Sequence, residues 1–301
     1  MTLQMDLPTL DDYPTRKATE AALLYRKDPT VWGTAEDGPF TDQELRDYDA
    51  RGYAQIEGLV TDDEVRTYYA ELERLGNDPE LRGDERLIVE PTSEEVRSVF
   101  EVHKISKVFS ELVNDPRLVE RARQILGSDV YVHQSRVNYK PGFGGGSFTW
   151  HSDFETWHAE DGMPRMRAVS FSIALTENFS HNGPLMIMPG SHKTFVSCIG
   201  ETPEDYYKSS LKSQDIGVPD QGALTCLADR HGIDVLTGPA GGITMFDSNC
   251  MHGSGGNITP YPRSNVFIVY NSVENACGTP FAASAPRPEF LSARDFTPVG
   301  R

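Results

Sequence analysis

The chain has 301 residues, of which 38% are hydrophobic and 24% charged, and its formal net charge is −17. This composition is typical of a soluble globular protein that can bury a substantial core. The acidic balance argues against a nucleic-acid partner and against an anionic membrane, since both are polyanions.

The N-terminal part of the sequence carries helix signals. Residues 1–40 are polar and acidic, and we interpret them as an arm or an irregular cover. Thr41 and Thr61 each precede a glutamate by three residues, the pattern of a capping box at a helix start. Pro116 and Gly127 bracket another predicted helix, and GYAQIEGLV is interpreted as a short strand. We therefore predict a mainly helical part over residues 41–127, packed on the core.

The pattern changes to short strands after residue 127. Runs such as VYVHQSRVNYK, SFTWHSDF, RAVSFSIAL and NVFIVYNSV are separated by glycine or proline turns. This order favours a mainly β fold with flanking helices, in which residues 128–301 form a jelly-roll (double-stranded β-helix, cupin-like) core. Residues 193–239 are irregular in composition, and we interpret them as an insertion that covers the site. We expect a single catalytic domain overall.

Neither a membrane span nor a disulfide framework is indicated. No apolar run approaches the roughly 20 residues that cross a bilayer, and the first residues lack the order of a signal peptide. The four cysteines include no C-x-x-C pair, which is typical of free thiols in a reducing compartment. We expect a cytoplasmic protein.

His151-Ser-Asp153, followed by His252, is a candidate metal site. Two imidazoles and one carboxylate can hold a divalent iron and leave the opposite side of the ion open. Residues i and i+2 of a strand point to the same side, so we expect His151 and Asp153 to share a strand face. Trp157 shares that face if the strand continues. One His-x-Asp triplet arises by chance in such a chain, so the interpretation depends on its neighbours.

Three further strands carry candidate site residues. Gln134, Arg136, Asn138 and Lys140 alternate along one strand and share one face. Such a face is either the solvated outside of a sheet or a polar interior that binds a ligand, and the periodicity is compatible with both. By the same alternation, Phe246, Ser248 and Cys250 share the face of His252, and Asn265 and Phe267 that of Arg263.

Arg263 opens a predicted strand eleven residues after His252. Its planar guanidinium can bind a carboxylate through two parallel hydrogen bonds, a geometry that lysine does not match. A lone strand arginine is otherwise an ordinary surface charge.

These residues resemble a known family, the iron(II)- and 2-oxoglutarate-dependent dioxygenases of the phytanoyl-CoA dioxygenase type. The resemblance rests on His151-x-Asp153, the run GPLMIMPGSH, His252-Gly-Ser254 and Arg263. Within this family, the run FTWHSDFETWHAEDGMP over residues 148–164 is similar to the signature stretch of ectoine hydroxylases. The similarity continues from DYPTR near the N-terminus to Asn271 and so covers most of the chain.

The resemblance implies a set of roles. His151, Asp153 and His252 would bind Fe(II), and O2 and 2-oxoglutarate would be co-substrates. Residues that would bind 2-oxoglutarate are Arg263, Lys140, Asn138, Ser254, Ser170 and Phe148. Residues that would bind ectoine are Gln134, Trp157, Phe246 and Phe267. The implied reaction is hydroxylation to 5-hydroxyectoine with release of succinate and CO2, and the implied assembly is a homodimer.

Several alternatives stay open at this point. Another small cyclic amino acid, such as proline, is the alternative substrate. The same ligands suit a zinc hydrolase or a binding protein that retains a metal site. His158-x-Glu160 is a second His-x-acid pattern, for which we favour a structural role. The sequence assigns no role to Arg136, and Cys250 is interpreted as a packing residue.

Overall fold

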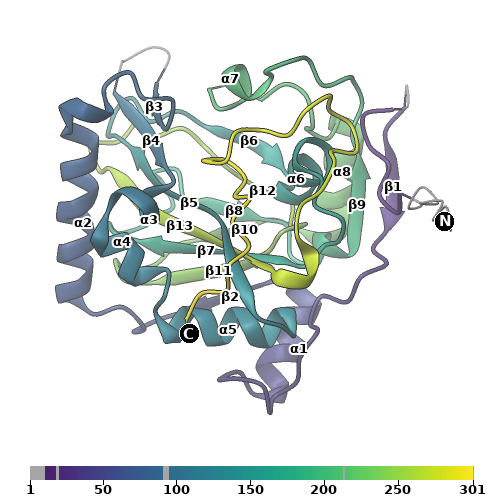
Figure 1. Ribbon diagram of the computed structural model, residues 1–301, viewed down its shortest axis with the longest axis horizontal. Helices are drawn as coiled ribbons and strands as arrows, with labels where there is room; N and C mark the ends of the chain where they lie inside the picture. Colours follow the sequence, from purple (N-terminus) through teal and green to yellow (C-terminus); the bar gives the residue numbers. More distant parts are fainter. Residues whose placement is uncertain (1–10, 18–19, 91–94, 213, 301) are drawn as a thin grey trace, which may run out of the picture.

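An antiparallel sheet of seven strands forms the largest element of the fold (Figure 1). The computed structural model describes residues 11–17, 20–90, 95–212 and 214–300. In spatial order the large sheet contains β2 (Tyr53–Ile56), β11 (Ile243–Asp247), β7 (Ala168–Ala174), β13 (Arg263–Ser272), β5 (Val130–Lys140), β4 (Val96–Phe100) and β3 (Leu87–Val89). The long central pair β5 and β13 runs in register from Arg263 opposite Lys140 to Ser272 opposite Val130, with one bulge.

A second antiparallel sheet of four strands completes the jelly-roll core that the sequence predicted. Its strands, in spatial order, are β10 (Asp234–Leu236), β8 (Leu185–Ile187), β12 (His252–Ser254) and β6 (Phe148–His151). A separate two-stranded ribbon pairs β1 (Ala22–Tyr25) with β9 (Thr194–Ser197).

Helices flank the sheets and begin and end at residues suited to those positions. Those of the described chain are α1 (Asp42–Arg51), α2 (Asp62–Asn77), α3 (Val102–Ile105), α4 (Lys107–Leu112), α5 (Pro116–Leu126), α6 (Asp153–Asp161), α7 (Tyr207–Ser210) and α8 (Gln221–His231). Both predicted capping boxes are present, at Thr41 and Thr61. The predicted helix from Pro116 is confirmed, and it ends at Gly127 in the left-handed conformation that glycine favours. None of these helices is long and apolar enough to cross a membrane.

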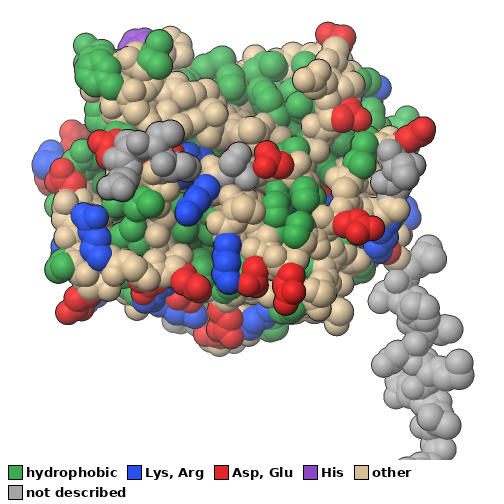
Figure 2. All heavy atoms as spheres, turned by 90° about the horizontal axis from the view of Figure 1, so that it is seen from above, with side chains coloured by type: hydrophobic (Ala, Val, Ile, Leu, Met, Phe, Trp, Pro, Cys, Tyr) green, Lys and Arg blue, Asp and Glu red, His purple; other side chains and the backbone are tan. Residues whose placement is uncertain are grey.

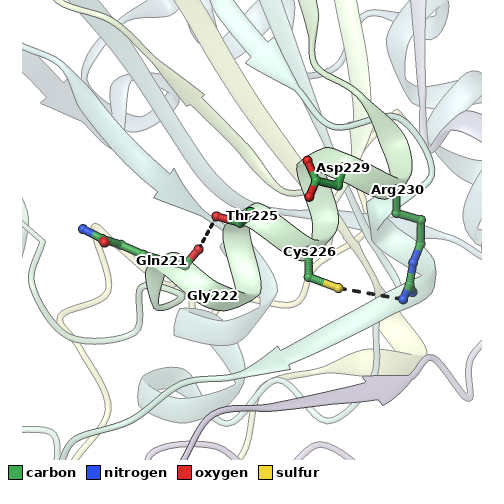
Figure 3. A pocket seen from close by; sticks show the side chains of 6 residues that line it. All are labelled: Gln221, Gly222, Thr225, Cys226, Asp229 and Arg230. Atoms are coloured by element: carbon green, nitrogen blue, oxygen red, sulfur yellow. Dashed lines mark hydrogen bonds between the residues drawn. The ribbon is translucent and has the colours of Figure 1, made fainter.

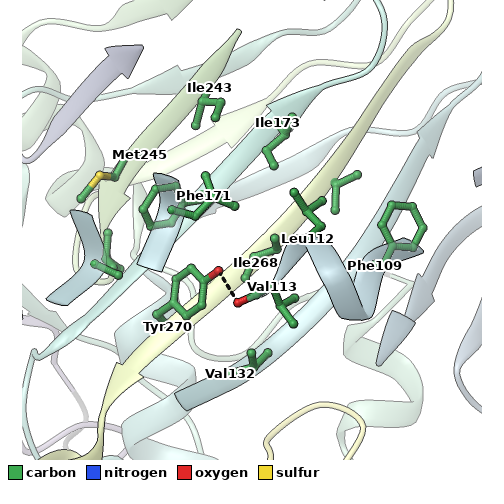
Figure 4. Close-up of a cluster of buried hydrophobic side chains, with 14 of the residues drawn as sticks. Phe109, Leu112, Val113, Val132, Phe171, Ile173, Ile243, Met245, Ile268 and Tyr270 are labelled. Carbon is green, nitrogen blue, oxygen red and sulfur yellow. Dashed lines mark hydrogen bonds between the residues drawn. The ribbon is translucent and has the colours of Figure 1, made fainter. Parts of the chain in front are cut away.

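The main hydrophobic core lies between the outer face of the large sheet and the helices (Figure 4). Phe171, Ile268 and Tyr270 of the sheet pack here with Phe109 and other residues of α4, and all four of these side chains are fully buried. The Tyr270 hydroxyl donates a hydrogen bond to the Val113 carbonyl at 2.9 Å. With this face covered, the alternate residues of the same strands point toward the smaller sheet, where the site is built.

Three segments differ from the sequence-based expectation. Residues 41–127 hold helices as predicted, and β2 lies within the predicted strand GYAQIEGLV, but this part also supplies β3 and β4 to the large sheet, which were not expected. The segment 193–239 contains β9, α7, α8 and β10 and is therefore not irregular throughout. The described residues of the N-terminal arm include β1 and the buried Tyr13. Most of these elements have only three to five residues, too few for a periodic pattern to show in the sequence.

Candidate active site

Three potential metal ligands meet where β6, β12 and α6 come together. His151, the last residue of β6, pairs directly with His252, the first residue of β12. Their ring centroids are 4.3 Å apart. Nε2 of His151 lies 3.6 Å from Oδ1 of Asp153, and Nε2 of His252 lies 4.0 Å from the same oxygen. One ligand atom from each residue can be chosen so that all three lie within 4.8 Å of one another.

Asp153 reaches this cluster from a helix, so the expected strand geometry is wrong. The strand β6 ends at His151, Ser152 caps the helix, and Asp153 is the first residue of α6. The side chains of His151 and Asp153 therefore converge across a strand-to-helix turn. Trp157 lies one helical turn beyond Asp153, and this i, i+4 spacing places the two on the same side of the helix. Likewise, Phe246 and His252 belong to different strands, so the regular alternation expected across residues 246–252 is not present.

The protonation of the cluster suits a metal ion. Burial, followed by the neighbouring His151, lowers the pKa of His252 to about 4, so its imidazole is neutral at pH 7. Burial would raise the pKa of Asp153, but the two imidazoles outweigh it and hold that pKa well below its usual range. Neutral imidazoles and an ionised carboxylate are the forms that bind metals.

Each histidine ring is also oriented by a backbone contact. Nδ1 of His151 lies 2.7 Å from the Thr149 carbonyl, and Nδ1 of His252 lies 2.9 Å from the Cys250 carbonyl. A carbonyl can only accept, so Nδ1 carries a proton in both rings, and the neutral tautomer that fits this contact leaves the lone pair of Nε2 for a ligand. This set of two nitrogens and one carboxylate fits Fe(II).

The polar face of β5 points inward, which excludes the solvated alternative. Gln134, Asn138 and Lys140 are each at most 6% exposed. In the paired strand β13, the residues opposite them are Val269, Asn265 and Arg263, all buried.

Arg263 is a buried cation without a carboxylate partner in the described part of the chain. It is 3% exposed, and its Nε has no hydrogen-bond acceptor. Burial lowers the pKa of this guanidinium to about 10, which leaves it charged at neutral pH. A buried charge without a counter-charge raises the free energy of the folded protein, so the site is suited to an anionic ligand.

Lys140, opposite Arg263, is also buried. Its Nζ donates to Oγ of Ser254 at 2.8 Å and to the Gly255 carbonyl at 2.6 Å. Burial, and then the charges of Arg263 and Arg97, lower the pKa of Lys140 to about 6. The Phe148 ring lies 5.4 Å from this Nζ, and the Arg97 guanidinium covers the ring at 3.9 Å.

A cavity of about 360 Å³ lies beside the metal cluster. Of the predicted residues, those that line it are Gln134, Phe148, His151, Asp153 and Trp157. Behind this lining, Phe246 packs on the His252 ring at 4.9 Å, and Oγ of Ser170 donates to Asp153 at 3.3 Å. Phe267 is buried in the cluster that contains Phe246, and Asn138 accepts a hydrogen bond from Ser98.

The cavity wall also contains residues to which the sequence assigned no individual role. Arg287 lines it and pairs with Asp161 at the end of α6, a contact over 126 residues that no local pattern indicates. Arg136 lies over Phe267 at 4.6 Å and donates to Gln134. Of the predicted cover, Ser210, Leu211, Lys212 and Gln214 line the cavity, and Gln214 donates to Thr156 of α6 at 3.3 Å.

Three other features lie outside the metal cluster. His158 contacts the Met163 carbonyl at 2.8 Å and Asp11 at 3.0 Å, which agrees with a structural role. Cys250 is fully buried, and its Sγ donates to the Gly52 carbonyl at 3.1 Å. A further hollow on the outside of α8 is open to solvent and shares no residue with the cavity at the metal cluster (Figure 3).

Comparisons with known proteins agree with this geometry. A sequence model of the phytanoyl-CoA dioxygenase family matches residues 48–265. The chain is 64% identical over 290 residues to the ectoine dioxygenase of Streptomyces avermitilis, with 96% of this chain and 98% of that relative covered. It is similar to the crystal structure of EctD from S. alaskensis with 2-oxoglutarate and 5-hydroxyectoine, with a TM-score of 0.87, 46% identity and 96% of each chain covered. The structure of EctD from S. alaskensis with bound Fe gives a TM-score of 0.86 and 45% identity, with 97% of each chain covered.

Proposed function

The chain belongs to the phytanoyl-CoA dioxygenase family, and we infer that it is an iron(II)- and 2-oxoglutarate-dependent dioxygenase that hydroxylates ectoine to 5-hydroxyectoine. Succinate and CO2 are the co-products. The observation that carries the reaction class is that ligand atoms of His151, Asp153 and His252 lie within 4.8 Å of one another, in a protein whose buried Arg263 has no acceptor for Nε in the described chain. The high identity to ectoine dioxygenases over nearly the whole chain favours ectoine over proline as the substrate.

The triad would hold the iron, and neither histidine nor Asp153 acts as a general base in this proposal. Iron(II), with 2-oxoglutarate and O2, supplies the oxidation that inserts one oxygen atom into a C–H bond while the keto acid loses CO2. The protein binds and orients the reactants and keeps water away from the reacting centre. Phe246 is fully buried and Phe267 is 5% exposed, and such apolar rings are suited to excluding water.

Arg263 would bind the distal carboxylate of 2-oxoglutarate through a bidentate contact. Lys140 and Ser254 lie beside it and are already joined by a hydrogen bond. Asn138, Ser170 and Phe148 would complete this part of the site. The proposal is supported by the burial of Arg263, Lys140, Asn138, Ser254 and Ser170, and by the absence of a carboxylate partner for Arg263 in the described chain.

Ectoine would occupy the cavity next to Trp157. Ectoine is a small zwitterion with a flat amidinium cation and a carboxylate. The indole of Trp157 can stack on the cation, an interaction of about 0.5–2 kcal/mol in a desolvated pocket. Gln134 offers a donor and an acceptor, and Arg287, which is paired with Asp161, also lines the cavity.

We also propose that the whole chain forms one catalytic domain, that it acts in the cytoplasm and that it assembles as a homodimer. The single-domain proposal is supported by strands from the N-terminal 127 residues that join the same large sheet as the site strands. The dimer proposal is supported by family resemblance, and size-exclusion chromatography with light scattering tests it.

A turnover assay tests the proposed reaction. The purified protein with Fe(II), 2-oxoglutarate, ascorbate and ectoine should release succinate and 5-hydroxyectoine in equal amounts. Asp153→Ala should abolish both products, and zinc should not replace iron. Succinate formation that ignores ectoine but responds to proline would assign the alternative substrate. Tight ectoine binding without 2-oxoglutarate turnover would instead identify a binding protein.

A further inference from the structure

A buried hydrogen bond joins the two segments that carry the metal ligands. Asn249, three residues before His252, is 1% exposed. Its Oδ1 accepts a hydrogen bond of 3.0 Å from Oγ of Ser152. Ser152 is the residue between His151 and Asp153, so the bond connects the turn that holds two ligands with the segment that leads to the third.

The surrounding groups determine that Ser152 is the donor and Asn249 the acceptor in this hydrogen bond. Nδ2 of Asn249 donates to the His192 carbonyl at 2.9 Å and to the Thr194 carbonyl at 3.1 Å. Both amide protons are thereby used, and a flipped amide would set its oxygen against two carbonyls. Oγ of Ser152 accepts from the backbone N–H of Glu155, which leaves its single proton for Asn249. Every donor on the two side chains is therefore committed in one arrangement.

The segment of Asn249 is itself anchored. The backbone N–H of Asn249 donates to Oδ1 of Asp247 at 2.8 Å, and Arg26 contacts the same carboxylate oxygen at 2.8 Å. Arg26 and Asp247 are almost fully buried. The N–H of Phe154, in the first turn of α6, donates to the Ser248 carbonyl at 2.8 Å. The start of α6 is thus held to this anchored segment by one side-chain bond and one backbone bond.

Asp153 depends on this bridge more than the two histidines do. His151 and His252 face each other in adjacent strands, so the sheet itself sets their separation. Asp153 lies beyond the end of β6, where no strand pairing fixes its position. A hydrogen bond at Ser152 acts directly on the turn that aims the carboxylate.

We propose that Ser152 and Asn249 are positioning residues of the iron site, which hold the Asp153 carboxylate at its distance from His252 before the metal binds. The inference rests on the iron site proposed above and adds two residues that do not themselves touch the ion. Groups that orient metal ligands typically contribute about 10- to 100-fold to metal affinity. Loss of the bridge should therefore weaken iron binding even in a protein that stays folded.

Iron affinity of the isolated protein, measured anaerobically without 2-oxoglutarate or ectoine, tests this role. Ser152→Ala and Asn249→Ala should each raise the Kd for Fe(II) by about 10- to 100-fold. Ser152→Thr keeps the hydroxyl and the helix cap and should bind within about threefold of wild type. The double variant should be little worse than either single variant, because both remove the same bond.

Asn275→Ala provides the matched control. Asn275 is fully buried, and its amide donates to the Arg165 carbonyl and accepts from the Arg165 N–H. Like Asn249, it bonds to backbone groups, but it contacts neither of the segments that carry the metal ligands. Asn275→Ala should lower the Tm of the metal-free protein and leave the Kd for Fe(II) unchanged. Equal Kd values for Asn249→Ala, Ser152→Ala and this control would overturn the positioning role. A wild-type protein that binds no iron would overturn the proposed function itself, and the positioning role with it.

Discussion

At the scale of single residues, Arg263 is the most sensitive position for the co-substrate. Its guanidinium is buried, charged and without an acceptor for Nε in the described chain. Arg263→Lys keeps a charge but loses the planar fork, and Arg263→Gln loses the charge as well. A charge-assisted hydrogen bond contributes about 1.5–3 kcal/mol. We therefore expect the KM for 2-oxoglutarate to rise by roughly 10-fold in the lysine variant and roughly 100-fold in the glutamine variant.

Iron affinity distinguishes this effect from a general loss of structure. The Arg263 variants should keep the Kd for Fe(II) within about twofold of wild type, since Arg263 makes no ion pair or hydrogen bond to the triad. Equal losses of iron and of 2-oxoglutarate binding would show that the strand had collapsed, and the assigned role would then be wrong.

We expect the binding of 2-oxoglutarate to be coupled to the protonation of Lys140. Burial and the neighbouring Arg263 and Arg97 lower its pKa from 10.5 to about 6, so at pH 8 the folded protein holds a neutral amine. A bound dianion favours the charged form, and binding of 2-oxoglutarate at a pH of about 8 should take up close to one proton. Calorimetry in buffers of different ionisation enthalpy measures this uptake. Lys140→Met should abolish the buffer dependence, whereas an unchanged dependence would assign the proton to another group.

The lowered pKa of Lys140 also makes the free energy of unfolding depend on pH. Between the folded pKa of about 6 and the unfolded value of 10.5, the unfolded chain binds more protons at Lys140 than the folded chain does. The contribution of Lys140 to the free energy of unfolding therefore increases as pH rises through this window.

At the scale of elements, the arm and α6 are joined by a buried ion cluster. Arg16 donates to both carboxylate oxygens of Glu155, at 2.9 and 2.7 Å, and to Glu160 at 2.6 Å. All three side chains are at most 3% exposed. Arg16→Met removes the guanidinium that pairs with both buried carboxylates, and we expect a loss of about 3–5 kcal/mol in the free energy of unfolding. Urea denaturation measures it.

The adjacent Lys17 gives the control for the Arg16 prediction. Its ion pair with Asp11 spans 3.3 Å and is half exposed on the lysine side. Lys17→Ala should therefore change the free energy of unfolding by less than about 1 kcal/mol. If Arg16→Met is as mild as Lys17→Ala, the arm does not stabilise α6.

The elements also show what the sequence could and could not reveal. The capping boxes at Thr41 and Thr61 and the glycine stop at residue 127 depend on local contacts, and each was predictable. The helix α6 was missed because it is buried almost all round and has no apolar stripe. Its start nevertheless carries a usable signal, since Ser152 precedes Glu155 by three residues, the same spacing as in the two capping boxes.

For the candidate site, residues on long strands could be placed and residues on loops could not. The alternation of β5 put Gln134, Asn138 and Lys140 on one face, and pairing with β13 brings Arg263 opposite Lys140. Arg287 joins the cavity wall through a partner far away in sequence, and only the three-dimensional fold reveals such a contact.

At the scale of the whole molecule, the net charge of −17 sets how the protein responds to salt. On the face in Figure 2, acidic side chains are spread around the edges with lysines and arginines between them, and no single acidic patch dominates. Repulsion among dispersed surface charges is screened by salt, because the Debye length falls from about 30 Å at 0.01 M to about 3 Å at 1 M. Buried pairs such as Arg16 with Glu155 are screened far less.

We therefore expect the Tm to rise as sodium chloride increases from about 0.01 to about 0.5 M. A gain of 1 kcal/mol corresponds to roughly 2–4 °C for a domain approaching this size. The control is a triple variant in which the exposed Glu57, Glu120 and Glu204 are changed to lysine, each substitution raising the net charge by two. The variant should start from a higher Tm at low salt and gain less on addition of salt. Equal gains in both proteins would attribute the effect to ion-specific or solvent effects and not to self-repulsion.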